Sequence, residues 1–256
     1  MSQIVNQPDL AFTFITPDWP APANVHAMQT TRIGGVSQAP YNSLNLGGHV
    51  NDDPIAVAHN RQLLSPYLPS EPVWINQVHG TKAIDAATAG YVVEADAAYA
   101  RKANTVCVTL TADCLPVLLC DEAGSIVAAV HAGWKGLLDG VIESTIKRMQ
   151  LAMPNLASEN LMAWLGPAIG PQAFEVGTEV REAFIAVDAN AALAFKSIGN
   201  DKWLGNIYQL ARQRLNTIGA SKVYGGDLCT YFDEARFFSY RRDNVTGRMA
   251  SIIWFT

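Results

Sequence analysis

The sequence predicts an α+β fold in which mixed β-sheets are flanked by helices. Short apolar runs typical of strands and amphipathic stretches typical of helices are interspersed without strict alternation. No repeat, heptad pattern or low-complexity tract divides the chain. A length of 256 residues with 49% hydrophobic content is enough to bury a full core. We therefore expect residues 1–256 to form a single domain.

The N-terminal part of the chain predicts two strands and a helix. Residues 12–15 are mostly apolar, lie before a proline-rich run and suit an edge strand, and residues 25–31 suit a second strand. An aspartate cap followed by Pro54 predicts a helix that ends near Tyr67.

The remaining elements follow from the same signals. Apolar runs bounded by turn residues predict strands at 95–100, 105–111, 117–120, 125–130, 161–165 and 223–224. Helical periodicity predicts helices at 137–153, 177–187 and 207–218, the last with Asn206 as its N-terminal cap.

Three residues of metal-binding type lie at the ends of predicted strands. His79 follows the apolar run 74–78, Cys114 lies just before a second run, and His131 follows a third. Two imidazoles and one thiolate form a three-ligand set for zinc, which leaves the fourth tetrahedral position to water or substrate. No CxxC or HExxH motif supports this hypothesis. The pattern alone also fits a buried core thiol and two locally hydrogen-bonded histidines.

Two residues in the N-terminal loops are candidates for substrate binding. Arg32 precedes paired glycines that permit a tight turn beside a cation, which suits an anion site. Asn45 lies in a glycine- and asparagine-rich loop and offers both a donor and an acceptor to a base or ribose. A solvated surface arginine and a turn-forming asparagine are the alternatives.

The C-terminal segment has a local positive balance in an acidic protein. Residues 236–256 contain one acidic residue, Asp243, and four arginines, namely Arg236, Arg241, Arg242 and Arg248. The whole chain, in contrast, has a net charge of -5. Arginine presents planar donors that match phosphate, so this contrast favours an anion site. Surface ion pairs are the alternative for each arginine.

Many unusual strings of this sequence resemble the laccase-domain family, also labelled polyphenol oxidase and associated with purine nucleoside phosphorylase activity. The resemblance extends from about Met28 to Trp254 and departs from the family pattern at Asn51, Lys135 and Asn206. The matching strings include TTRIGGVS at 30–37, SLNLG at 43–47, NQVHG at 76–80, TADCLP at 111–116, HAGW at 131–134, LGPAIG at 165–170 and FSYRR at 238–242.

The resemblance implies a central β layer that bears the metal site at one edge and is covered by helices. It also implies phosphorolysis of adenosine, inosine and 5'-methylthioadenosine, together with adenosine deamination. Zinc at His79, Cys114 and His131 suits deamination because zinc activates water near neutral pH. Proton transfer then needs a carboxylate, for which Asp113 and Glu175 are candidates. Phosphorolysis needs a nearby arginine cluster, and Arg32, Arg241 and Arg242 are our candidates.

The histidine count excludes a four-copper oxidase. Such an enzyme needs roughly ten histidine ligands, partly as His-x-His pairs. This chain has five histidines and no His-x-His pair. The three proposed ligands can still hold one copper ion, since copper outcompetes zinc for such ligands.

The runner-up hypothesis is a cysteine hydrolase. Cys114 with His79 or His131 can act as a thiolate nucleophile and its base. The resemblance supports this alternative because the family is also linked to peptidoglycan precursor editing, in which a wrongly incorporated amino acid is removed. A metal-dependent binding module without catalysis is a third possibility.

Composition also limits the partners. The net negative charge offers no general attraction to nucleic acid or anionic membranes, so we expect small-molecule partners, namely purine nucleosides and phosphate. No apolar stretch approaches a membrane-spanning length, and the four cysteines show no disulfide-like spacing. We therefore expect a cytoplasmic protein.

Overall fold

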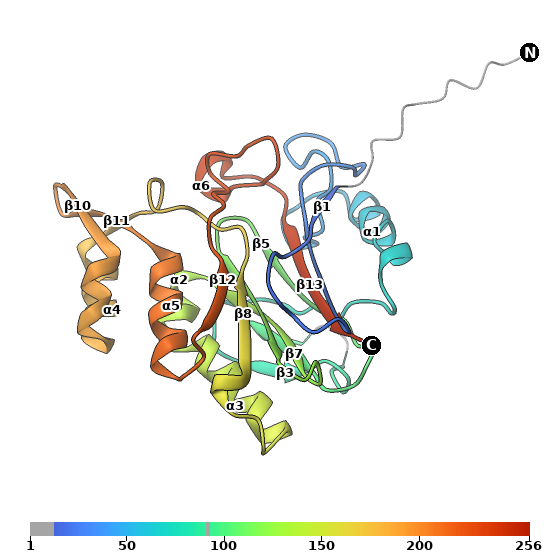
Figure 1. Ribbon diagram of the computed structural model, residues 1–256. Helices are drawn as coiled ribbons and strands as arrows, with labels where there is room; N and C mark the ends of the chain where they lie inside the picture. Colours follow the sequence, from blue (N-terminus) through green and yellow to red (C-terminus); the bar gives the residue numbers. More distant parts are fainter. Residues whose placement is uncertain (1–12, 91–92) are drawn as a thin grey trace, which may run out of the picture.

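Two large β-sheets form the centre of the protein, and helices flank them (Figure 1). The computed structural model describes residues 13–90 and 93–256. A four-stranded antiparallel sheet has the order β1 (Phe14–Ile15), β2 (Val25–Thr30), β13 (Met249–Phe255) and β5 (Cys107–Thr111). The predicted mixed α+β architecture is confirmed. Phe12, which we assigned to the edge strand, lies outside the described residues.

The second large sheet is six-stranded and mixed. Its order is β12 (Lys222–Gly225), β8 (Leu161–Leu165), β6 (Leu115–Asp121), β7 (Val127–Ala132), β4 (Ala97–Ala100) and β3 (Ala83–Asp85). The two outer pairs, β12 with β8 and β3 with β4, are parallel, and the inner pairs are antiparallel. A small third sheet contains β10 (Phe195–Gly199), β11 (Lys202–Gly205) and β9 (Glu175–Gly177).

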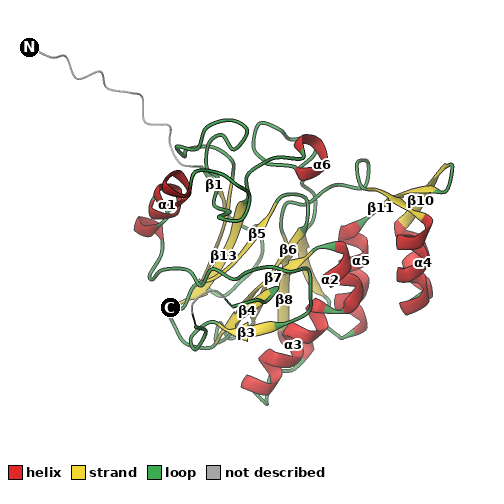
Figure 2. Ribbon diagram, turned by 180° about the vertical axis from the view of Figure 1, so that it is seen from behind, coloured by secondary structure: helices red, strands yellow, loops and turns green. Residues whose placement is uncertain are grey.

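The two large sheets share a core. Side chains from both sheets, among them Cys107, Leu118, Trp164 and Ile253, form one buried apolar cluster. The opposite face of the six-stranded sheet packs against helices, whereas α1 (Pro54–Gln62) lies on the other side of the molecule (Figure 2). The covering helices are α2 (Trp134–Asp139), α3 (Val141–Ala152), α4 (Thr178–Val187) and α5 (Ile207–Thr217).

Two predicted helices need correction. The helix that begins at Pro54 ends at Gln62 rather than near Tyr67, and residues 65–67 form a separate 3-10 turn. Pro66 explains the early end, because proline lacks an N–H donor and disfavours helical geometry in the residue before it. The helix predicted at 137–153 is two helices, since Gly140 adopts a left-handed conformation with φ of 91°.

Both predicted caps are confirmed. The Asp53 side chain accepts the backbone N–H of Ile55, and the Asn206 side chain accepts that of Gln209. A short C-terminal helix, α6 (Tyr240–Asp243), begins after Ser239, whose side chain accepts the N–H of Arg242. In the described part of the chain, no helix is long and apolar enough to cross a bilayer.

Candidate metal centre and cleft

Cys114 lies at the corner where the chain passes from one large sheet to the other. Strand β5 ends at Thr111 in the four-stranded sheet, and β6 begins at Leu115 in the six-stranded sheet. Strand β6 pairs with β7 so that Pro116 lies opposite His131. The register therefore brings Cys114 beside His131, as expected for residues at neighbouring strand ends.

His79 reaches the same place from a loop. The predicted strand at 74–78 is wrong, because residues 73 and 76 form only isolated bridges and no ladder. His79 has a φ of 59°, an uncommon conformation for a residue other than glycine. The carboxylate of Asp96 stabilises this turn by accepting the N–H groups of His79 at 2.9 Å, Gly80 at 2.7 Å and Val78 at 3.3 Å.

Asp96 also orients His131. Its Oδ1 lies 2.9 Å from Nδ1 of His131, and its backbone carbonyl accepts the His131 N–H at 2.7 Å. Burial raises the pKa of Asp96, but hydrogen bonds from His131 and the Gly80 backbone outweigh it and lower that pKa below its usual value. An ionised carboxylate only accepts, so Nδ1 of His131 carries the proton and Nε2 is left for a ligand. Sequence analysis missed Asp96, although an acid within the otherwise apolar predicted strand 95–100 was a usable signal.

The three side chains converge as the sequence predicted. Their ligand atoms all lie within 4.8 Å of one another, and Sγ of Cys114 is 3.8 Å from Nε2 of His79. Tetrahedral zinc with one thiolate and two imidazoles separates sulfur and nitrogen by about 3.5 Å. No second group of three His, Cys, Asp or Glu side chains this close occurs in residues 13–90 and 93–256.

Gly133 leaves room between these ligands. A Cβ atom at this position would lie 3.0 Å from both Sγ of Cys114 and Cδ2 of His79. Its φ of -58° and ψ of 157° are accessible to any residue, so backbone conformation does not explain the glycine. The donor set and this cradle fit a metal ion, and they are also compatible with more than one metal.

Without metal, the cluster favours a thiolate beside an imidazolium. Burial raises the pKa of the Cys114 thiol, but the charge and hydrogen bond of His131, helped by His79, lower it to about 6. Burial lowers the pKa of His131, but Cys114 and Asp96 raise it to about 9. A readily formed thiolate suits both a metal ligand and a nucleophile.

The cluster opens into a cleft of about 740 Å³, a volume suited to a small molecule. Apolar and aromatic side chains form part of its wall, including Trp134, Ile169, Phe174 and Tyr240. Basic side chains line it as well, namely His49, Lys135, Arg241 and Arg248. The cleft is therefore locally positive in a protein of net charge -5.

The predicted candidates Arg241 and Asp113 lie in this lining. Arg241 is exposed, and its Nη1 donates to the backbone carbonyls of Ala173 and Glu175. Asp113 is buried and accepts hydrogen bonds from Thr230, Ser239 and the Arg241 backbone at 2.6 to 3.0 Å. Its carboxylate thus fixes the loop that carries Arg241 against the β5–β6 corner.

The structure does not bring the other candidates into the cleft lining. Arg242 uses all five of its donor positions on Asp243 and three backbone carbonyls. Asn45 is fully buried, and its side chain binds Asp52 and the backbone of Gly47 and Arg248. Arg32 donates to two backbone carbonyls and lies over the ring of Phe238, and Glu175 pairs with Lys202. Contacts of these residues with substrate stay predictions.

Sequence analysis did not select His49, Lys135 or Arg248 as binding residues. Arg248 was counted only as part of the arginine-rich segment. Its backbone N–H donates to the Asn45 side chain, so the buried asparagine positions this arginine. His49 and Lys135 each lie within two residues of a string that matched the family, at 43–47 and 131–134, and this proximity was the available signal for these two residues.

The fold and the site define an α+β protein with a candidate three-ligand metal centre in a cleft of small-molecule size. A family model described as multi-copper polyphenol oxidoreductase laccase matches residues 26–256, and the chain belongs to this family.

Relatives with established names agree with this assignment. The chain is 56% identical to purine nucleoside phosphorylase YfiH of Escherichia coli K12, over 94% of this chain and 98% of that protein. It is 53% identical to a purine nucleoside phosphorylase of Haemophilus influenzae, with the same coverage. Among solved structures, Neisseria meningitidis protein NMB0706 aligns with a TM-score of 0.90 at 49% identity, covering 94% of this chain and 98% of that one. Geobacillus stearothermophilus YlmD aligns with a TM-score of 0.89 at 28% identity, covering 97% and 99%.

Proposed function

We propose that this protein is a zinc-dependent purine nucleoside phosphorylase that also deaminates adenosine. The proposal rests on one observation above all: the His79, Cys114 and His131 cluster and the cations Arg241 and Arg248 line the same cleft. The names of the relatives support the reaction class. The substrates we propose are adenosine, inosine and 5'-methylthioadenosine.

Phosphorolysis transfers the ribosyl group from the purine base to phosphate. The phosphate oxygen bonds to the anomeric carbon as the bond between that carbon and the base nitrogen breaks. Arg241, Arg248 and Lys135 supply positive charge at the cleft wall for the attacking anion. Phosphate bound by these residues is already oriented for attack, so the entropic cost of orienting it does not add to the reaction barrier.

The purine base needs an apolar surface to bind against. Trp134, Ile169, Phe174 and Tyr240 give the cleft aromatic and aliphatic walls against which a planar base can pack. Zinc, when bound, would act as a Lewis acid and supply an activated nucleophile near neutral pH, which suits deamination. Asp113 is the carboxylate in the lining and is our candidate for proton transfer.

A second candidate function follows from the metal-free cluster. The pKa of Cys114 is about 6, and its Sγ lies 3.8 Å from Nε2 of His79. A thiolate beside an imidazole is the arrangement of a cysteine hydrolase, which would fit the editing of peptidoglycan precursors. Copper in place of zinc is a further possibility that the ligand set allows.

Product analysis tests the proposal. Purified protein is given each of the three nucleosides with and without phosphate, and free base, ribose phosphate and ammonia are measured. We expect base release that requires phosphate, and ammonia from adenosine without it. Absence of both products, with cleavage of an amide-containing precursor instead, would overturn the proposal in favour of the hydrolase.

A further inference from the structure

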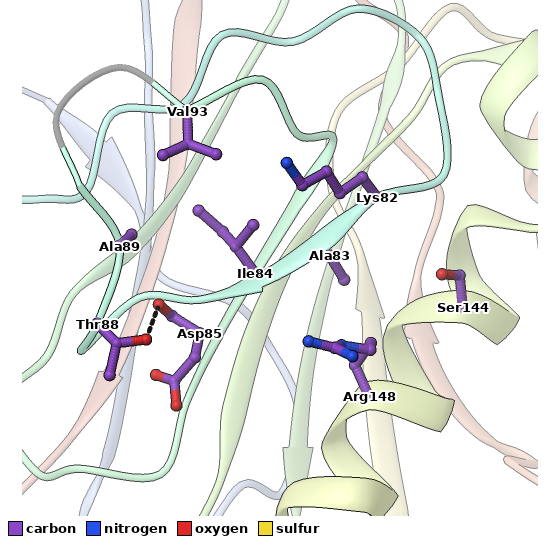
Figure 3. Close-up of a pocket in the computed structure, with 9 residues that line it drawn as sticks. All are labelled: Lys82, Ala83, Ile84, Asp85, Thr88, Ala89, Val93, Ser144 and Arg148. Atoms are coloured by element: carbon purple, nitrogen blue, oxygen red, sulfur yellow. Dashed lines mark hydrogen bonds between the residues drawn. The ribbon is translucent and has the colours of Figure 1, made fainter.

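A second cavity lies on the far edge of the six-stranded sheet, between β3 and α3 (Figure 3). Its volume is about 520 Å³, and it shares no lining residue with the cleft of the metal centre. Strand β3 is the edge strand of its sheet, and the lining residues Lys82, Thr88 and Arg148 are exposed, so the cavity is open to a ligand from solution. Neither the proposed reaction nor the metal centre involves this cavity.

Two cations from different elements extend into the cavity. Lys82 precedes β3 and extends toward Ile84 and Val93, whereas Arg148 lies on α3, on the side of β3 that carries Ala83 and Asp85 (Figure 3). In the part of the chain that the structure describes, neither the Lys82 ammonium nor the Arg148 guanidinium has an ion pair or hydrogen bond. The ion-pair explanation for clustered surface charge therefore does not apply here.

The remaining polar groups complete the lining. Ser144 lies four residues before Arg148 on α3, so both side chains face the cavity from one side of the helix. Asp85 contributes one negative charge and accepts the Ala87 N–H, and the Thr88 hydroxyl bonds weakly to the Asp85 carbonyl at 3.4 Å. Two positive charges against one leave the cavity positive in an acidic protein.

We propose that this cavity binds a small organic anion. Its phosphate or carboxylate group would lie at the open edge of β3, between Lys82 on one side and Arg148 and Ser144 on the other, and its apolar part would cover Ile84 and Val93. The volume supports an organic ligand, because a cavity of this size holds far more than one inorganic ion.

The test measures binding rather than turnover, so its result is independent of the proposed reaction. Zinc-loaded full-length protein is titrated by calorimetry with phenyl phosphate, benzoate and inorganic phosphate. We expect phenyl phosphate or benzoate to bind, and whichever binds identifies a phosphate or a carboxylate as the anionic group. Inorganic phosphate lacks the apolar part of the aromatic anions, so it should bind this site at least about tenfold more weakly than they do. Burial of one phenyl ring is worth 1.5 kcal/mol or more, which is about tenfold in affinity.

Matched variants assign the binding to this cavity. Arg148→Met should weaken it about tenfold or more, whereas Lys147→Met, on the same helix but outside the lining, should not. Lys82→Met is the second variant, because the backbone carbonyl of Lys82 keeps its bonds to Asp96 and Ala97. Arg241→Met shows whether the measured binding takes place in the cleft of the metal centre instead, because Arg241 lines that cleft. Equal affinities in the Arg148 and Lys147 variants, or binding lost only with Arg241→Met, would overturn the proposal.

Discussion

The carboxylate of Asp96 lies 2.9 Å from Nδ1 of His131 and also accepts the backbone N–H of His79 at 2.9 Å. One buried acid thus fixes two candidate metal ligands that come from a strand and from a loop. The carboxylate holds the ring of His131 and the backbone of His79, and the two imidazoles lie in a T-shaped arrangement with centroids 4.7 Å apart.

Asp96→Asn should therefore weaken metal binding. The amide cannot accept the three N–H groups and the His131 ring as a carboxylate does, and loss of such a partner costs about 10- to 100-fold in metal affinity. Competition with a chromogenic chelator measures the change. Asp121→Asn is the matched control, because Asp121 is also buried and binds Ser125 and Ile126, away from the cluster. Equal zinc affinity in the two variants would refute this role for Asp96.

Gly133→Ala should remove the metal while the protein stays folded. The added methyl group would lie 3.0 Å from Sγ of Cys114 and from Cδ2 of His79, so both ligands would have to move away from the positions in which they converge. Elemental analysis should find well under one zinc per chain, and the melting temperature of the metal-free variant should match that of chelated wild type. Gly90→Ala is the control, since a Cβ there meets nothing within 4 Å. Full zinc content in the Gly133 variant would contradict the assignment of the cradle.

Arg241→Met should raise the phosphate KM more than it reduces deamination. A hydrogen bond to a charged group is worth about 1.5 to 3 kcal/mol, which corresponds to at least about tenfold in KM for phosphate. Arg242→Met serves as comparison, because its donors are already used within the loop and we expect it to lower stability by about 1 to 3 kcal/mol. Equal loss of both activities in the Arg241 variant would indicate a role in folding or shared substrate binding instead.

Alkylation should report the state of Cys114. In chelated protein its pKa is about 6, and because the thiolate is the reactive, deprotonated form, the rate should rise with pH around 6 and level off above about 7. Zinc should suppress the reaction. The measurement uses a Cys229→Ala background, which removes the other partly buried thiol. Burial raises the pKa values of Cys107 and Cys120, so these two thiols stay protonated at the pH values used. A midpoint near the ordinary value of about 8.5 would show that the histidines do not stabilise the thiolate.

Local signals predicted much of the fold and part of the site. Cys114 and His131 could be located because each flanks an apolar run that forms a strand, and the pairing of β6 with β7 then brings them together. His79 was selected as a ligand although its strand was not formed. Its position depends on Asp96, a long-range contact that no local pattern contains.

Other features depended on single residues or on the folded arrangement. The break at Gly140 was missed because apolar periodicity continues across it, while one left-handed residue ends α2. The arginine-rich segment was found by its charge, but charge alone does not distinguish Arg241, in the cleft lining, from Arg242, which binds its own loop. That distinction requires the anchoring of the loop by Asp113.

Turnover before and after chelation tests the central claim most directly. Base release from inosine and ammonia release from adenosine are measured in the isolated protein, after zinc removal, and after zinc is restored. We predict that both activities fall at least about a hundredfold without zinc, return with it, and are insensitive to iodoacetamide in the zinc-loaded protein. Full activity of the metal-free protein, abolished by alkylation of Cys114, would contradict the metal-centred account and support the thiolate nucleophile.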